Sequence, residues 1–325
     1  MILEVCPDIF RIEVPLPENP LQHVNSYVVM SGGAVLIVDT GFNLDVCDRV
    51  LPEGLAQLGV DAARAEFFIT HMHPDHAGLV HRLAGQSKRI YCGAKEIRHR
   101  IDRGLWARFL SAGRASGLAE ADLEALSLRY PAFHYDARWL SSATALREGD
   151  VVTVGDYRFE CVETPGHTMG HACLFDPKGS ILIAGDHILS DITPNITGWL
   201  DDENRLSLYL ESLSKVAALS IETLLPGHRG IIDNCRRRIG EIEAHHRKRS
   251  EEVMKILRDG PMTGSSVASR MTWDLRVRSW EAFPPAQRWF ATGEALAHLR
   301  YLEAQGFVVK DLSTDGEYFA IQEEC

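Results

Sequence analysis

The sequence lacks the features that are typical of membrane-spanning proteins, of proteins held by disulfides or cysteine-bound zinc, and of proteins whose whole surface binds nucleic acid. No stretch approaches the roughly 18–20 unbroken apolar residues that a membrane-spanning helix needs. Cys-x-x-Cys does not occur, and the seven cysteines are scattered and odd in number, which favours reduced thiols over a disulfide framework or a cysteine-built zinc site. Positive charge is also scarce, because 34 Lys and Arg stand against 45 Asp and Glu. This balance disfavours a protein whose whole surface follows nucleic acid.

Other absences narrow the chemistry. Neither Gly-x-Ser-x-Gly nor a Gly-x-Gly-x-x-Gly that follows a strand is found, so a serine nucleophile of that type and a nucleotide cofactor have no support. The first cation, Arg11, comes after Glu4 and Asp8, so the basic start of a secretory signal is lacking and we expect a cytoplasmic protein. What is present is an ordinary globular composition, in a chain long enough for one large domain and a smaller one.

Short apolar runs alternate with turn residues through the first two thirds of the chain. Three turns, at 31–33, 155–156 and 176–179, join apolar runs in the manner of β-hairpins. Helical periodicity appears between strands near residues 44–58 and 205–218. Hairpins with interspersed helices predict an α+β fold of two mixed sheets, covered by helices on their outer faces.

Two regions depart from this pattern. Strand signals vanish at about 94–140, which predicts an aromatic-rich helical insertion that either packs as a satellite core or covers a pocket. Residues 236–310 carry 14 Lys and Arg against 9 Asp and Glu, and their expected order of three helices and a hairpin is that of a winged helix. We therefore expect a catalytic domain over 1–235, which contains the insertion, and a winged-helix-like domain over 236–325.

The strongest motif is His-Met-His-Pro-Asp-His at residues 71–76, directly after an apolar run. His71 and His73 are two apart in extended chain, so they project to the same side and can bind one metal ion. The proline ends the extension, and Asp75 and His76 then point in different directions at the start of a helix, where they can serve a second ion. A solvated His-rich turn is the alternative, which three histidines at fixed positions disfavour. Nitrogen and carboxylate ligands predict Zn²⁺, with Fe and Mn as alternatives.

Three more residues of ligand type share one context, directly after a predicted strand and beside a glycine that allows close backbone approach. They are His167 in Pro-Gly-His-Thr, Asp186 in Ala-Gly-Asp and His228 in Pro-Gly-His. A single histidine after a strand is more often structural, but three repetitions of the context indicate one site at the strand ends. We interpret His171 and His187 as structural or as supports of the ligands.

With these motifs the chain resembles the metallo-β-lactamase superfamily. The motif at 71–76, the three later residues and Val-Asp-Thr-Gly at 38–41 are that family's five motifs in family order, over roughly residues 1–235. The resemblance implies an αββα sandwich with two divalent metal ions at one edge. It places one ion on His71, His73 and His167. The other ion lies on Asp75, His76 and His228, with Asp186 as a bridge between the two. Asp39 is expected to orient ligands without binding metal.

The resemblance also implies the reaction. Two metal ions would share a water and lower its pKa, and the resulting bridging hydroxide would attack a carbonyl carbon. Asp75 would orient this hydroxide and later carry a proton to the leaving group. The pattern is similar to glyoxalase II, lactonases and lactamase-beta-like proteins with an appended winged helix. We therefore expect hydrolysis of a thioester, lactone or related small acyl substrate, in a pocket shaped by the insertion and by the loop 190–204 with Trp199.

Two other classes of function stay open. An endoribonuclease or phosphodiesterase whose C-terminal module contacts nucleic acid is suggested by the basic clusters 236–238 and 247–249, although glutamates are interleaved with the second and the remaining chain is strongly acidic. A regulator that has lost activity would have lost metal ligands, and none of the seven is missing. We expect the C-terminal module to pack beside the active site or to form a homodimer, and we expect no membrane partner.

Overall fold

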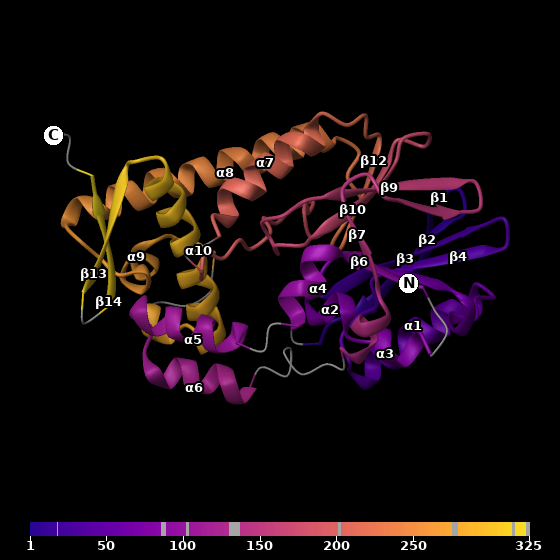
Figure 1. Cartoon of the computed structure of the whole chain (residues 1–325), viewed down its shortest axis with the longest axis horizontal. Coiled ribbons are helices and arrows are strands. Elements are labelled where there is room, and N and C mark those ends of the chain that lie inside the picture. The colour runs from indigo at the N-terminus through magenta and orange to yellow at the C-terminus, as the bar shows by residue number, and fades with distance from the viewer. Residues whose placement is uncertain are drawn as a thin grey trace. The chain divides into compact units, whose positions relative to one another are not determined.

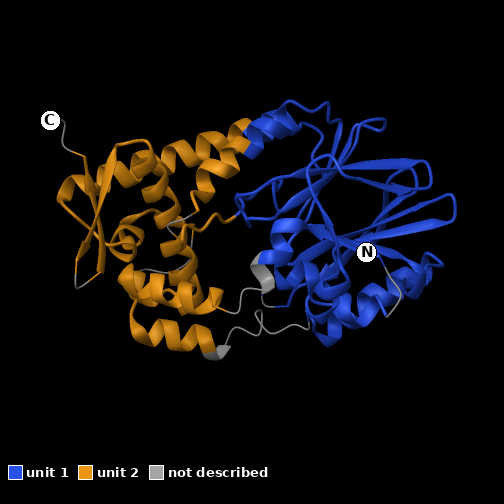
Figure 2. Cartoon of the chain, in the orientation of Figure 1, with its two compact units in different colours: residues 1–101, 131–194, 212–239 blue, residues 102–130, 195–211, 240–325 orange. Residues whose placement is uncertain are grey.

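The computed structural model describes residues 1–17, 19–85, 89–101, 104–129, 137–200, 203–274, 279–313 and 316–322. Its contacts divide the chain into two compact units (Figure 2). Unit 1 comprises residues 1–101, 131–194 and 212–239, and unit 2 comprises residues 102–130, 195–211 and 240–325. Each unit is therefore assembled from stretches that are separate in the sequence.

Unit 1 is built on two β-sheets with the strand orders β1-β2-β3-β4-β5-β6-β7 and β12-β11-β10-β9-β8 (Figure 1). Strands β4 to β7 are parallel neighbours in the first sheet, as are β11 and β12 in the second, and the other pairs are antiparallel. The expectation of two mixed sheets is confirmed. The strands are β1 (Ile2–Cys6), β2 (Ile9–Pro15), β3 (His23–Ser31), β4 (Ala34–Val38), β5 (Glu66–Ile69), β6 (Ile90–Gly93), β7 (Thr144–Leu146), β8 (Val151–Val154), β9 (Tyr157–Glu163), β10 (Ala172–Asp176), β11 (Ile181–Gly185) and β12 (Thr223–Pro226).

Alternation of side chains along the strands explains the layers of unit 1, because successive side chains of a strand point to opposite faces of its sheet. Ile37 and Phe67 are buried in a cluster with residues of the helix α1 (Asp45–Gln57). Their neighbours Val38 and Phe68 are buried in a second cluster with residues of the other sheet, such as Phe159 of β9. The seven-stranded sheet thus has a helix on one face and the five-stranded sheet on the other.

Further helices of unit 1 flank these sheets. The later part of α7 (Arg205–Ala217) contacts the five-stranded sheet, where Lys215 donates a hydrogen bond to the carbonyl of Glu163 at the end of β9, and Ser212 donates one to the carbonyl of Pro165 in the loop that follows. α1 and α7 confirm the helices expected near 44–58 and 205–218. The helices with residues in unit 1 are α1, α2 (Pro74–Ala77), α3 (Val80–Leu83), α4 (Ala94–Ile101) and, shared with unit 2, α7 (Arg205–Ala217) and α8 (Cys235–Ile256).

Unit 2 has a core of its own, to which residues of α6 (Glu120–Arg129), α8, α9 (Gly264–Arg270) and α10 (Pro285–Ala304) contribute. Leu123 of α6, Val267 of α9 and Leu296 of α10 are buried together with Phe319 of the C-terminal hairpin. Trp199 and Trp289 stack in this core with ring centroids 3.8 Å apart. The elements of unit 2 besides α7 and α8 are α5 (Leu105–Ala115), α6 (Glu120–Arg129), α9 (Gly264–Arg270), α10 (Pro285–Ala304), β13 (Val308–Ser313) and β14 (Gly316–Ile321).

The order of three helices and a hairpin over α8, α9, α10, β13 and β14 is the expected one, while the assignment of a winged helix stays a prediction. The compact units differ from the expected division at residue 235, since 102–130 and 195–211 cluster with 240–325. Part of the expected insertion, 102–103 and 130–136, lies outside the described residues. None of the described helices combines the length and apolarity that crossing a membrane requires.

Candidate metal centre

Strand ends at one edge of the two sheets of unit 1 supply the candidate ligands and Asp39, which is expected to orient them. Asp39 follows β4, His71 comes two residues after β5, and Asp186 directly follows β11. His167 and His228 come shortly after β9 and β12. The carboxyl ends of parallel neighbours meet at one edge of a sheet, which is where α/β folds place their functional residues. The residues that share this context in the sequence therefore lie at one edge of the fold.

The first group of ligand-type residues is His71, His73 and His167. His71 Nε2 lies 2.9 Å from His73 Nδ1, and His167 Nε2 lies 3.0 Å from the same His73 atom. Ligand atoms about 2.1 Å from one tetrahedral ion lie roughly 3.4 Å from one another. The spacing of these three ring nitrogens is therefore close to that of three ligands of one ion.

The second group is Asp75, His76 and His228. The Nε2 atoms of His76 and His228 are 3.3 Å apart, and Asp75 Oδ2 lies 3.4 Å from His228 Nε2 and 3.9 Å from His76 Nε2. Here too two nitrogens and a carboxylate oxygen face a common point. The adjacent residues 75 and 76 reach it from the first turn of α2.

Asp186 lies between the two groups. Its Oδ2 is 3.7 Å from His167 Nε2 and 3.5 Å from His228 Nε2, while its Oδ1 is 3.5 Å from His76 Nε2. Oδ1 is buried and accepts no hydrogen bond from the described residues. A buried carboxylate oxygen that accepts no hydrogen bond is costly, and a bound cation would remove that cost. The position is the one that a bridging ligand would need.

Hydrogen bonds on the far side of the rings fix their orientation. His76 Nδ1 donates to Asp39 Oδ2 at 2.7 Å, and His228 Nδ1 donates to the carbonyl of His23 at 2.7 Å. Thr70 donates to Asp39 from both its backbone nitrogen (2.9 Å) and its hydroxyl (2.8 Å). These bonds leave the Nε2 atoms of both rings directed at the site, as in the known pairing of metal-bound histidines with carboxylates and carbonyls. Asp39 thus contacts His76 without pointing at the common points.

The carboxylates of the cluster are buried, so a positive charge beside them is stabilising. Burial lowers the pKa of the His71 imidazole well below its usual value, and the neighbouring His76 and His73 lower it further, so the ring is neutral. Burial also opposes charge on His228, yet Asp186 and Asp75 raise the pKa of that ring to about 10. In the metal-free protein the carboxylates therefore retain a proton on this imidazole. A divalent cation supplies the same compensation, so the donor set fits a divalent metal site.

Two supporting residues, Tyr27 and Asn25, carried no recognisable signal in the sequence, whereas His171 was already expected to be structural or a support of the ligands. Tyr27 and Asn25 of β3 donate to the carbonyl of Pro226 at 2.8 and 2.9 Å, which anchors the segment before His228. His171 accepts a hydrogen bond from the backbone nitrogen of Asp186 at 3.2 Å. Such contacts join residues up to about 200 positions apart in sequence, where no local pattern connects them.

The basic clusters of the sequence make contacts within the chain. Arg238 donates to the carbonyls of Leu189 and Ile192 at 2.7 and 2.8 Å in unit 1. Arg249 of unit 2 is buried and pairs with Glu294 at 3.1 Å and with Glu252 at 2.7 Å. Guanidinium groups held in this way have little left to offer a phosphate backbone, so these two arginines give the nuclease alternative no support.

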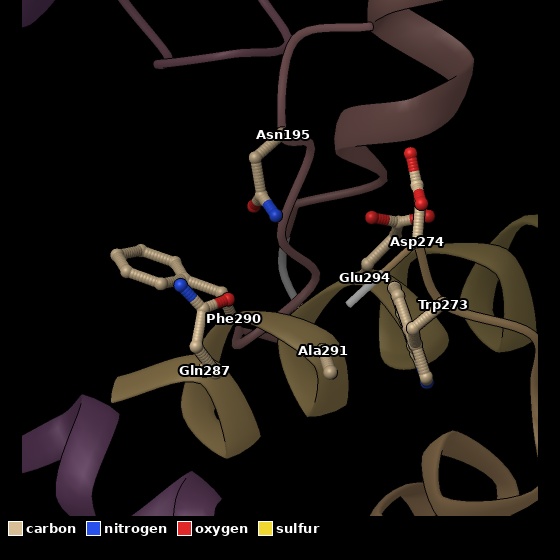
Figure 3. Close-up of a pocket in the computed structure, with 7 residues that line it drawn as sticks. All are labelled: Asn195, Trp273, Asp274, Gln287, Phe290, Ala291 and Glu294. Atoms are coloured by element: carbon tan, nitrogen blue, oxygen red, sulfur yellow. The ribbon is translucent and has the colours of Figure 1, made fainter. Parts of the chain in front are cut away.

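Unit 2 also contains a small cavity of about 180 Å³ (Figure 3). Its lining offers carboxylates, amides and aromatic rings but no histidine or cysteine, so it differs in kind from the metal-ligand groups of unit 1. Asn195 connects it with the loop 190–204, while the expected role of that loop and of Trp199 in a substrate pocket stays a prediction. The lining residues are Asn195, Trp273, Asp274, Gln287, Phe290, Ala291 and Glu294.

Comparisons with known proteins indicate the same family that the sequence motifs resemble. The family model described as the metallo-beta-lactamase superfamily matches residues 19–228. The chain is 24% identical over 326 residues to the probable metallo-hydrolase YqjP of Bacillus subtilis, covering 96% of this chain and 97% of that one. It is 27% identical to the human acyl-coenzyme A thioesterase MBLAC2, over 63% of this chain and 72% of that one. A metallo-beta-lactamase family protein of Thermus thermophilus has a solved structure with a TM-score of 0.82 and 29% identity, covering 98% of this chain and 100% of that one.

Proposed function

We propose that this chain, which belongs to the metallo-beta-lactamase superfamily and is a metal-dependent hydrolase, cleaves a small acyl substrate, with a thioester as the first candidate. The observation that carries the proposal is the pair of three-residue ligand groups with Asp186 within reach of both. The likeness to a protein named as an acyl-coenzyme A thioesterase supports the choice of thioester. A lactone or a related acyl compound is the next candidate.

The proposed roles of the residues follow from their positions. His71, His73 and His167 would hold one divalent ion, Asp75, His76 and His228 would hold the second, and Asp186 would contact both. Divalent ions bound there supply Lewis acidity, which lowers the pKa of water and polarises a carbonyl oxygen. Zn²⁺ is the ion that we propose, because imidazole and carboxylate ligands suit it, and Fe and Mn are the alternatives.

Asp75 has a second proposed role as the group that moves the proton. It lies in the first turn of α2, and 12% of its side chain is exposed, so substrate can approach it. Its carboxylate can accept a hydrogen bond from the attacking water and later pass a proton to the leaving group. A thiolate leaving group needs little help from this proton transfer, because a thiol has a pKa of about 8.5, far below that of an alcohol.

A panel of substrates tests this assignment. The purified protein, loaded with Zn²⁺, is given acyl-coenzyme A thioesters of several chain lengths, lactones and a structured RNA, each with and without chelator. We expect chelator-sensitive release of free thiol from at least one thioester and no cleavage of RNA. Cleavage of RNA with inert thioesters and lactones would overturn the acyl assignment and favour the phosphodiesterase. Failure to bind any metal would overturn the proposed metal centre itself.

A further inference from the structure

Two loops carry the first ligand group, and they leave different sheets. The loop after β5 holds His71 and His73, while the loop between β9 and β10 holds His167. Three ligands of one ion have to be aligned to a few tenths of an ångström, so something has to fix one loop against the other. The direct backbone tie is a hydrogen bond from Ala172 N to Thr70 O at 3.0 Å.

Glu96 contacts both loops at once. It lies in the first turn of α4, and 3% of the residue is exposed. Its Oε2 accepts a hydrogen bond from the backbone nitrogen of Met72, between His71 and His73, at 3.3 Å. Its Oε1 accepts one from the backbone nitrogen of Gly170 at 3.1 Å and one from the hydroxyl of Thr168, the residue after His167. A single carboxylate therefore joins the two loops next to three ligand-type residues.

Close packing of the backbone keeps this carboxylate in place. A methyl group on Gly170 would lie 2.0 Å from the backbone nitrogen of Glu96, and one on Gly93 would lie 2.1 Å from the carbonyl oxygen of Gly170. Such distances forbid any side chain at either position, so the loop of His167 rests directly on the start of α4. The backbone of Glu96 is therefore held directly against the loop of His167, which is what a fixed strut between two loops requires.

We propose that Glu96 is a positioning residue for the first ligand group, which brings His167 into register with His71 and His73 before an ion binds. Its role rests on the proposed function and deepens it. Both oxygens of the carboxylate accept hydrogen bonds, and an amide can accept at only one of its two ends. Glu96→Gln therefore breaks the contact with one loop while it keeps the size of the side chain.

The test measures the affinity of each metal step by competition with a chelator, using Co²⁺ to follow the ligand field of each site. His167→Ala and His228→Ala identify which step belongs to which group. We expect Glu96→Gln to weaken the step that His167→Ala removes by about 10- to 100-fold, the usual cost of losing a partner of a metal ligand. The step that His228→Ala removes should change by less than about threefold.

Two further variants separate positioning from general stability. Thr168→Val keeps the shape of the side chain and deletes only the hydroxyl bond to Glu96, so it should weaken the same step by a smaller factor. If Glu96→Gln does not fold, the affinity measured for Thr168→Val tests the positioning role in its place. Val152→Ala is the control for stability, because Val152 is buried in β8, outside both loops, and its truncation lowers stability without removing a contact of Glu96.

The outcomes distinguish this inference from the proposed function. Selective weakening of the first group supports the positioning role. Equal weakening of both steps, or a loss of affinity that Val152→Ala reproduces at the same loss of thermal stability, overturns it and leaves a structural role. Unchanged affinities in Glu96→Gln also overturn it. If the unaltered protein binds no Co²⁺ or Zn²⁺, the proposed metal centre fails, whatever Glu96 does.

Discussion

Asp186 in unit 1 and Arg249 in unit 2 are both charged side chains held away from solvent, but their surroundings differ. Arg249 is met by groups that complement it: two carboxylates, the carbonyl of Thr272 at 2.7 Å, and the ring of Trp273 at 4.3 Å. Asp186 faces three imidazoles, those of His76, His167 and His228. Each of the two charged groups keeps one buried atom, Asp186 Oδ1 and Arg249 Nη2, that has no hydrogen bond with the described residues. The buried charge of unit 2 is paired within the chain, whereas the cluster of unit 1 gathers electron-pair donors around common points. Imidazole nitrogens and carboxylate oxygens directed at common points indicate a cation site better than buried charge alone does.

The substitution with the largest expected effect disrupts the cluster of ligand-type residues in unit 1. Asp186→Asn removes the charge between the two ligand groups, so it should lower bound metal below two ions per chain and reduce turnover at least about a hundredfold. Asp176→Asn is the matched control, because Asp176 is also a buried aspartate of the same sheet but accepts its hydrogen bond from Gly179 in a turn. Metal analysis and turnover of both variants check this. Full activity in Asp186→Asn would reject the bridging role.

Metal removal should destabilise the site loops of unit 1 and leave unit 2 unchanged. A ligand that binds only the folded state at a hundred times its Kd adds about 2.7 kcal/mol to the free energy of unfolding. We expect chelation to speed hydrogen exchange in the loops 70–76 and 164–171 and to leave α9 and α10 unchanged, since these helices belong to unit 2. Exchange that rises equally in both units would contradict this local effect.

Breaking the charge pairing of unit 2 should affect stability alone. Arg249→Met leaves Glu294 with 15% of its side chain exposed and no cation at 3.1 Å, so we expect a loss of about 2–4 kcal/mol in urea unfolding. Burial already raises the pKa of Glu294 although Arg249 lies beside it. The double variant Arg249→Met/Glu294→Gln should recover part of the loss. Metal content should stay unchanged, and a drop in it would contradict the division of roles.

The smallest expected effect is a change in the pH dependence of unit 2. Burial, and then His245 and Arg249, lower the pKa of the His246 imidazole to about 3. The unfolded chain binds this proton near pH 6.5, so the free energy of unfolding should fall as pH drops from about 6.5 toward 3. The slope from one such group is at most about 1.4 kcal/mol per pH unit. His246→Gln should reduce the slope of wild-type stability against pH, and identical slopes would show that the ring is protonated in the fold.

Local patterns in the sequence predicted a large part of the fold. The hairpins of β3–β4, β8–β9 and β10–β11 and the helices α1 and α7 lie where turn residues and periodicity predicted them, because these elements depend on residues close in sequence. The membership of residues 102–130 in unit 2 could not be predicted in this way. It depends on packing of residues such as Leu123 with residues of the C-terminal helices, far along the chain.

The sequence by itself determined which side chains are candidates for the metal centre, because a strand end, a glycine and a histidine or aspartate are local features of the chain. Only the tertiary structure decided how the loops that carry them are held in place. Glu96, Asn25 and Tyr27 lie outside every recognisable motif, and each acts on a loop that belongs to another part of the chain. The physical reason is that ligand type is chemistry carried by one residue, whereas ligand geometry is a sum of hydrogen bonds and close backbone contacts that exist only in the folded chain.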